Sequence, residues 1–179
     1  HMVSVTPDGK TAYTANIWSN SITAVDTAKH RILYHLPVPE RPEGMAFSPD
    51  GSLMYCVCRE ARAVVVVDCR KGQVVDRIKT GHGPVRVVIT PDGSRLCLPL
   101  FHSAAVQIAD TKTRKVTHTF PVGPHPAGTC ISPDGNLVFM SCEDENLVYV
   151  FDMDNLAVIN KIRTGNGADA MVCLYRSEI

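Results

Sequence analysis

One four-residue motif, Pro-Asp-Gly preceded by Ser or Thr, recurs four times at a constant spacing. Its copies begin at positions 6, 48, 90 and 132, so each follows the last by 42 residues without an insertion. A constant period of this length indicates a repeat protein, in which the folding unit is the repeat. Proline suits the first turn position, aspartate bonds to its own backbone and glycine accepts a positive φ. Each copy therefore predicts a tight turn.

The residues around each motif predict four short strands. In the second repeat these strands are expected at residues 45–48, 53–58, 63–68 and 73–78. The third is nearly all valine, as in a strand covered on both faces, whereas the fourth alternates apolar and polar side chains, as in a half-solvated outer strand. The third strand of each repeat ends in aspartate, at Asp26, Asp68, Asp110 and Asp152. Four short strands per 42 residues, joined by tight turns, are typical of a β-propeller blade.

The predicted fold is therefore all-β, with four four-stranded antiparallel blades and a lone C-terminal inner strand. His1–Met2 is interpreted as a cloning remnant, and one propeller repeat domain is expected over 3–179. Blades are expected at about 3–38, 39–80, 81–122 and 123–164, with the extra strand at 169–174 and the turn motif lost at 174–177. We expect either part of a larger ring or an array completed by self-association (a homo-oligomer) through its open blade edges, since unpaired edges bind other chains.

Charge, hydrophobic runs and cysteine content exclude several classes of partner and of binding site. Lys plus Arg and Asp plus Glu both number 18, so neither nucleic acid nor an anionic membrane is expected as a partner. The longest apolar run, Ala63 to Val67, is too short to cross a bilayer. The seven cysteines are odd in number and irregularly spaced, which fits neither a disulfide framework nor paired zinc knuckles. Cys56 and Cys58 are interpreted as small apolar residues on one strand face.

Further residues recur beside the turns. The first repeat carries Tyr13-Thr14-Ala15-Asn16 followed by Val25-Asp26. The second carries Pro42, Gly44, Ala46, the turn at 48–51 and Tyr55. In these features residues 3–174 resemble the YVTN family of β-propeller repeats, although Leu100 and Cys142 replace the asparagine in the third and fourth repeats. The resemblance implies a propeller, with seven blades typical of complete rings, and it implies little about function because such repeats occur in many kinds of protein.

The two ends of a propeller should differ in role. If the strands of a blade are named A to D from the channel outwards, the A–B and C–D turns share one face. The repeated aspartates of that face are interpreted as caps of their own turns rather than calcium ligands. The B–C and D–A loops form the other face, called here the loop face, where the repeats differ in sequence. A specific site is expected there.

Six residues of the loop face are the candidate ligand-binding residues: Glu43, Arg86, His82, His102, His125 and Asp169. The three histidines come from neighbouring blades and are expected near the channel mouth, with solvated loop histidines as the alternative. Imidazoles there could ligate a metal, lie near a haem or act as a general base. The other three candidates are expected where strands A begin, to bind a polar ligand or to solvate the channel.

We expect a non-enzymatic binding or scaffold module that holds a protein or a small-molecule ligand on its loop face. The alternative implied by the resemblance is a catalytic or cofactor-handling propeller: a lactonase-like hydrolase, a quinoprotein dehydrogenase subunit or a haem-handling protein. In that case His82, His102 and His125 would serve near the channel mouth. The sequence contains no Ser-His-Asp order, phosphate-binding loop or HExxH motif, so no catalytic residue, metal site or cofactor is predicted.

Overall fold

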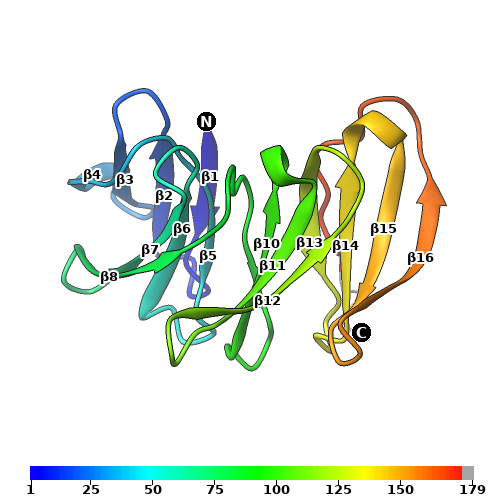
Figure 1. Cartoon of the computed structure of the whole chain (residues 1–179). Helices are drawn as coiled ribbons and strands as arrows, with labels where there is room; N and C mark the ends of the chain where they lie inside the picture. The colour runs from blue at the N-terminus through cyan, green and yellow to red at the C-terminus, as the bar shows by residue number, and fades with distance from the viewer. Residues whose placement is uncertain (175–179) are drawn as a thin grey trace.

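The computed structural model describes residues 1–174, and these form four four-stranded antiparallel sheets. In Figure 1 the four sheets follow one another as upright blades, from blue at the N-terminus to orange near the C-terminus. Each sheet takes its four strands in sequence order, so every blade is built from one repeat. The all-β fold of four four-stranded blades is thus confirmed. The described residues include no helix that could cross a membrane.

The strand bounds follow the 42-residue period. Blade one contains β1 (Met2–Val5), β2 (Thr11–Asn16), β3 (Ser21–Asp26) and β4 (Arg31–Pro37). Blade two contains β5 (Pro42–Phe47), β6 (Leu53–Cys58), β7 (Ala63–Asp68) and β8 (Gln73–Lys79). Blade three contains β9 (Val88–Ile89), β10 (Arg95–Leu100), β11 (Ala105–Asp110) and β12 (Lys115–Pro121), with a 3-10 helix η1 (Phe101–Ser103). Blade four contains β13 (Pro126–Ile131), β14 (Leu137–Cys142), β15 (Leu147–Asp152) and β16 (Ala157–Arg163), with a second 3-10 helix η2 (Glu143–Glu145).

The core consists of three apolar clusters, one between each pair of neighbouring blades. Strand β7 explains why valine runs were expected at strand C. Val65 and Val67 pack towards blade one, whereas Val64 and Val66 pack towards blade three, and all four are fully buried. Burying one such side chain stabilises the fold by about 1.5–3 kcal/mol. Packing on both faces of the middle strands therefore holds the blades together.

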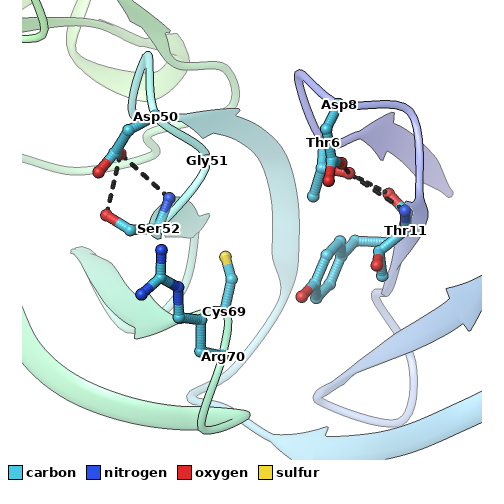
Figure 2. A pocket seen from close by; sticks show the side chains of 9 residues that line it. Thr6, Asp8, Thr11, Asp50, Gly51, Ser52, Cys69 and Arg70 are labelled. Carbon is cyan, nitrogen blue, oxygen red and sulfur yellow. Dashed lines mark hydrogen bonds between the residues drawn. The ribbon is translucent and has the colours of Figure 1, made fainter.

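The repeated aspartates act within their own turns, as expected. Asp50 Oδ1 accepts hydrogen bonds from Ser48 Oγ at 2.6 Å and from the Ser52 backbone N–H at 3.1 Å. These bonds lower the pKa of Asp50 to about 2. Figure 2 shows this carboxylate turned back on Ser52, beside the equivalent Thr6–Asp8 turn of blade one. Asp26 likewise accepts the backbone N–H groups of Ala28 and Lys29.

The A–B turns also join neighbouring blades. The turn glycine of each of blades two to four lies against the turn proline of the blade before it. A Cβ added to Gly135 would lie 2.7 Å from Cδ of Pro91, and one added to Gly51 would lie 3.2 Å from Cδ of Pro7. Gly9, in the first blade, has no atom within 4 Å of the same position. The motif therefore shapes its own turn and leaves room for the preceding blade.

Residues 169–174, expected as a fifth inner strand, form no strand in the structure. Each other inner strand pairs with the strand that follows it in sequence, and the described residues contain no such partner for this segment. The segment nevertheless lies beside blade four, where Ser141 Oγ donates a hydrogen bond to the carbonyl oxygen of Asp169 at 3.0 Å. The expected loss of the turn at 174–177 lies, from residue 175 on, outside the described residues. Met2, interpreted as part of a cloning remnant, is the first residue of β1.

Candidate functional site

Backbone hydrogen bonds hold the loops of the loop face together. The B–C loop of a blade donates to the D–A loop that leads into the same blade: Phe101 N–H bonds to Gly83 O at 2.8 Å, and Glu143 N–H bonds to His125 O at 3.3 Å. Ser103 Oγ adds a bond to the carbonyl oxygen of His82 at 3.0 Å. These loops lie along the upper edge of the molecule in Figure 1. Their side chains are therefore presented from a fixed backbone.

A chain of ion pairs surrounds the channel mouth. Glu43, at the start of β5, is only 3% exposed, and its Oε1 lies 2.9 Å from Nη1 of Arg59. Arg86 Nη1 lies 3.4 Å from Glu43 Oε2, and Arg86 Nη2 lies 3.4 Å from Asp169 Oδ1. The structure thus brings together the three residues expected at the channel. Arg59, which was not among the six candidates, completes the network.

Burial dominates the electrostatics of Glu43. Removal of the carboxylate from water raises its pKa above the usual 4.5, although Arg59 and Arg86 act in the opposite direction. Glu43 Oε1 is buried without a hydrogen bond of good geometry, even though Arg59 lies within ion-pair distance. The carboxylate is therefore incompletely compensated by the residues described.

The three candidate histidines lie in one row of rings. The ring centroids of His82 and His102 are 4.9 Å apart, and those of His102 and Phe101 are 5.3 Å apart. Phe101 stacks on His125 at 4.4 Å with an interplanar angle of 19°. His125 Nδ1 lies 2.8 Å from Oδ2 of Asp144. Because Phe101 also lines the channel mouth, this row and the ion-pair network form one continuous surface.

Backbone conformation singles out His125. It has a φ of +48°, and the equivalent residues one repeat before and after it are glycines, also with positive φ. A left-handed conformation costs a non-glycine residue about 1–2 kcal/mol. The equivalent residue two repeats earlier, Arg41, has a φ of +60° and places its guanidinium 4.0 Å from the ring centroid of Trp18. Both strained residues therefore stack their side chains on an aromatic ring.

Repeat position is the signal that would have identified Arg59 and Phe101. Apart from Arg86, the residues that line the mouth come from two repeat positions: one is shared by His1, Glu43, Val85, Ala127 and Asp169, and the other by Arg59, Phe101 and Glu143. All copies of one position have the same place in their blade. A residue near the mouth in one blade therefore predicts its equivalents in the others. Polarity alone did not single out Phe101.

The mouth and ring row carry a surplus of negative charge. Four carboxylates, from Glu43, Glu143, Asp144 and Asp169, face two guanidinium groups, from Arg59 and Arg86, and two imidazoles, from His1 and His125. Burial, followed by repulsion from Asp169, raises the pKa of Glu143. Within residues 1–174, no group of three or more His, Cys, Asp or Glu side chains is arranged to hold a metal ion.

An apolar cavity continues below the mouth. It has a volume of about 280 Å³ and is lined by inner strands and by the segment after β16, with Met45, Val88 and Met171 among its residues. The mouth itself encloses about 140 Å³. The charged entrance therefore opens above an apolar channel.

Comparisons with known proteins identify the fold. No protein-family model matches the chain, and no curated protein matches it. Hydrazine synthase of Kuenenia stuttgartiensis superposes on 89% of the chain with a TM-score of 0.84 and 26% identity. A protein of unknown function from Desulfotomaculum acetoxidans superposes on 93% with a TM-score of 0.79 and 21% identity. A candidate 6-phosphogluconolactonase of Bacteroides uniformis superposes on 93% with a TM-score of 0.80 and 18% identity.

These likenesses concern architecture. At 21% and 18% identity, the second and third structures show the fold alone. The chain covers 47%, 56% and 55% of the three matched structures, so it spans about half of their length. The matched structures named as a synthase and a lactonase candidate have β-propeller folds. The chain consists of four blades of a β-propeller.

Proposed function

We propose that the loop face is the binding surface of a non-enzymatic module, and that it holds a cationic group carried by a protein segment or a small molecule. The observation that carries this proposal is the excess of carboxylates beside a row of aromatic rings. A cation at the mouth would offset the two effects, burial and then repulsion from Asp169, that raise the pKa of Glu143. It would also lie near the ring of Phe101, and cations bind to ring faces with about 0.5–2 kcal/mol.

The pairing of the polar groups supports binding rather than catalysis. The carboxylate of Glu43 is paired with the guanidinium groups of Arg59 and Arg86. A general base or nucleophile needs a lone pair directed at a reacting atom. Here the charged groups are directed at one another, which fits a preorganised recognition surface.

The test uses an arrayed set of short peptides that differ only in charge, each carrying Lys or Arg, Glu or neutral residues. We expect the full chain to bind the basic peptides, and we expect affinity to fall as salt is added, because exposed charges are screened within about 8–10 Å at 0.1–0.15 M salt. Glu143→Gln and Phe101→Ala should each weaken binding. Asp134→Asn, which removes a carboxylate from the turn face, is the matched control and should leave binding unchanged.

Two results would contradict the proposal. One is equal affinity for basic and acidic peptides. The other is binding that Asp134→Asn weakens as much as Glu143→Gln. Circular dichroism of each variant shows whether a loss of binding reflects a loss of fold.

A catalytic or cofactor-handling propeller is the second candidate function. The observation that favours it is the pair formed by His125 and Asp144 at 2.8 Å, since a carboxylate can orient an imidazole as a general base. Two of the matched structures also carry the names of enzymes. Lactone hydrolysis by the chain that is lost in His125→Ala and retained in His118→Ala would support this candidate. Bound metal by elemental analysis or a visible absorbance band would also support it.

We propose further that the blades are of the YVTN type and that a second copy of the chain covers the open blade faces. The 42-residue period supports the repeat type. On the open face of blade one, Val3, Val5 and Ile32 are 64%, 50% and 57% exposed. The matched structures are about twice as long as this chain, so two copies would supply a comparable number of blades. Light scattering should give a dimer mass that Val5→Lys reduces, and a monomer at all concentrations would exclude the second copy.

A further inference from the structure

Two cysteine thiols meet where the C-terminal segment lies along blade four. Cys173 Sγ lies 2.8 Å from Cys130 Sγ, in a contact between two reduced thiols. Cys130 belongs to β13 and Cys173 to the segment after β16, and both are half-buried. The thiols of Cys56 and Cys58 also interact, but both belong to β6 and both are fully buried. The odd cysteine count had pointed away from a disulfide framework, so this pairing comes from the fold.

Few contacts hold this segment in place. Asp169 accepts a hydrogen bond from Ser141 and pairs with Arg86 at 3.4 Å. The carbonyl oxygen of Asp169 fills the space beside Gly128 that a Cβ at that position would occupy. Ala170 and Met171 then line the central cavity. The segment therefore forms part of the channel wall without the hydrogen-bond ladder that fixes the inner strands of the blades.

We propose that Cys130 and Cys173 form a reversible disulfide that fastens residues 169–174 to the inner strand of blade four. The oxidant is a low-molecular-weight disulfide such as oxidised glutathione. The Cys173 thiol, having lost its proton to solvent, attacks one sulfur and releases one thiol, leaving a mixed disulfide. Cys130 then loses its proton, attacks the Cys173 sulfur and releases the second thiol. Two protein thiols and one external disulfide thus become one protein disulfide and two external thiols.

The environment of Cys130 sets the order of these steps. Burial, together with the adjacent Cys173 thiol, raises the pKa of Cys130 to about 12. Since the thiolate is the nucleophile, Cys130 is held in its unreactive form while the pair is reduced. Cys173 lies on the segment after β16, which few contacts hold in place, so in the proposed order it reacts with the external disulfide first. Conversion of Cys173 to the mixed disulfide removes the neighbouring thiol and places an electrophilic sulfur beside Cys130.

The linkage can be read directly from peptides. The full chain is incubated with oxidised or reduced glutathione, alkylated, digested with trypsin and analysed by mass spectrometry without reduction. Oxidised protein should yield peptide 116–161 joined to peptide 164–176, and dithiothreitol should release the two. Fragmentation of the joined species should place the bond at Cys130 and Cys173. Hydrogen exchange at 169–174 should slow on oxidation, because the bond holds the segment against β13.

Two variants separate this pair from incidental oxidation. Cys173→Ser should abolish both the joined peptide and the slower exchange. Cys142→Ser alters the other cysteine of peptide 116–161 and should retain both effects. A mixed disulfide with glutathione that never resolves, or a bond from Cys173 to Cys142, would overturn the proposal. So would a linkage that leaves exchange at 169–174 unchanged. None of these outcomes depends on ligand binding at the loop face.

Discussion

The contact between successive turns leads to a quantitative prediction about glycine. Gly9 and Gly135 occupy the same position of the same turn, with φ values of +73° and +78°. Only their surroundings differ. A Cβ at Gly9 would meet no atom within 4 Å, whereas one at Gly135 would lie 2.7 Å from Cδ of Pro91. Substituting alanine at both positions therefore separates the cost of the backbone conformation from the cost of the contact between blades.

The expected costs follow from these two terms. Gly9→Ala should reduce the free energy of unfolding by about 1–2 kcal/mol, because alanine is strained in the left-handed region. Gly135→Ala should have the same conformational cost and should lose about 1–3 kcal/mol more of unfolding free energy through the contact, since the proline ring is rigid and either it or the turn must shift. The difference between the variants should therefore be about 2 kcal/mol. With a urea dependence of about 2 kcal/mol per molar, the midpoint of Gly135→Ala should lie about 1 M below that of Gly9→Ala.

The assay is urea unfolding followed by far-UV circular dichroism, with the Pro91→Ala background completing a double-mutant cycle. Pro91→Ala removes the ring atoms that the new methyl group would meet. In that background Gly135→Ala should cost only the conformational term of about 1–2 kcal/mol. The coupling energy between the two positions should thus equal the contact term of about 1–3 kcal/mol.

Equal destabilisation by Gly9→Ala and Gly135→Ala, within about 0.5 kcal/mol, would refute the argument. So would a coupling energy near zero. Either result would mean that the turns shape their own blades and contribute nothing to the packing of one blade on the next. Gly167→Ala, with a φ of +69° and no atom within 4 Å, provides a second measure of the conformational cost outside the A–B turns.

Three further predictions concern the core and the carboxylates. Phe151→Ala should reduce the free energy of unfolding by about 3–5 kcal/mol, because the Phe151 ring is 1% exposed between blades three and four. Ile162 is 46% exposed, so Ile162→Ala should reduce it by under about 1 kcal/mol. Urea unfolding measures both variants. Glu43 has a raised pKa in the folded chain, so it binds more protons there than in the unfolded chain. The free energy of unfolding should therefore fall as pH rises from 4.5 through the pKa of Glu43 in the folded chain. In urea unfolding at a series of pH values, Glu43→Gln should remove this dependence of stability on pH. Asp50, whose pKa is lowered from 3.8 to about 2, has the opposite sign: its contribution should be complete above pH 3.8 and lost as pH falls to about 2, and Asp50→Asn should flatten this acid dependence.

The sequence was most informative where the chain repeats itself. The strands expected at 53–58 and 63–68 coincide with β6 and β7, because turn chemistry marks their ends and burial on both faces demands an apolar run. It was less informative at the inner strand of blade three. There β9 contains only Val88–Ile89, and Pro84, which has no N–H to donate, takes part in a single isolated bridge with Leu100. The segment at 169–174 matched an inner strand in pattern, but strand formation also needs a partner.

The sequence indicated the face on which the candidate residues lie, but the six candidates did not include every residue that contacts them there. The reasoning that the varying loops share one face led to Glu43, Arg86 and Asp169, which the structure joins through ion pairs. Phe101 was expected on the same face but was not among the six candidates, because an apolar loop residue carries no chemical signal of its own. Its role depends on stacking against His125, which is a property of the folded loops. The charge surplus likewise emerges only after the partners of each carboxylate are known.

The turn face and the loop face both follow the 42-residue period, but they differ in which features repeat. On the turn face, each copy of the motif keeps its residues, because the aspartate caps its own turn and the glycine leaves room for the turn proline of the preceding blade. At the loop end, the backbone also repeats, with positive φ at Arg41, Gly83, His125 and Gly167. There the side chains differ from copy to copy. A fixed backbone with free choice of side chain lets charge and aromatic character be altered at the mouth with little effect on blade packing. Substitutions at Glu143 should therefore change binding more than stability, whereas substitutions at Gly135 should do the reverse.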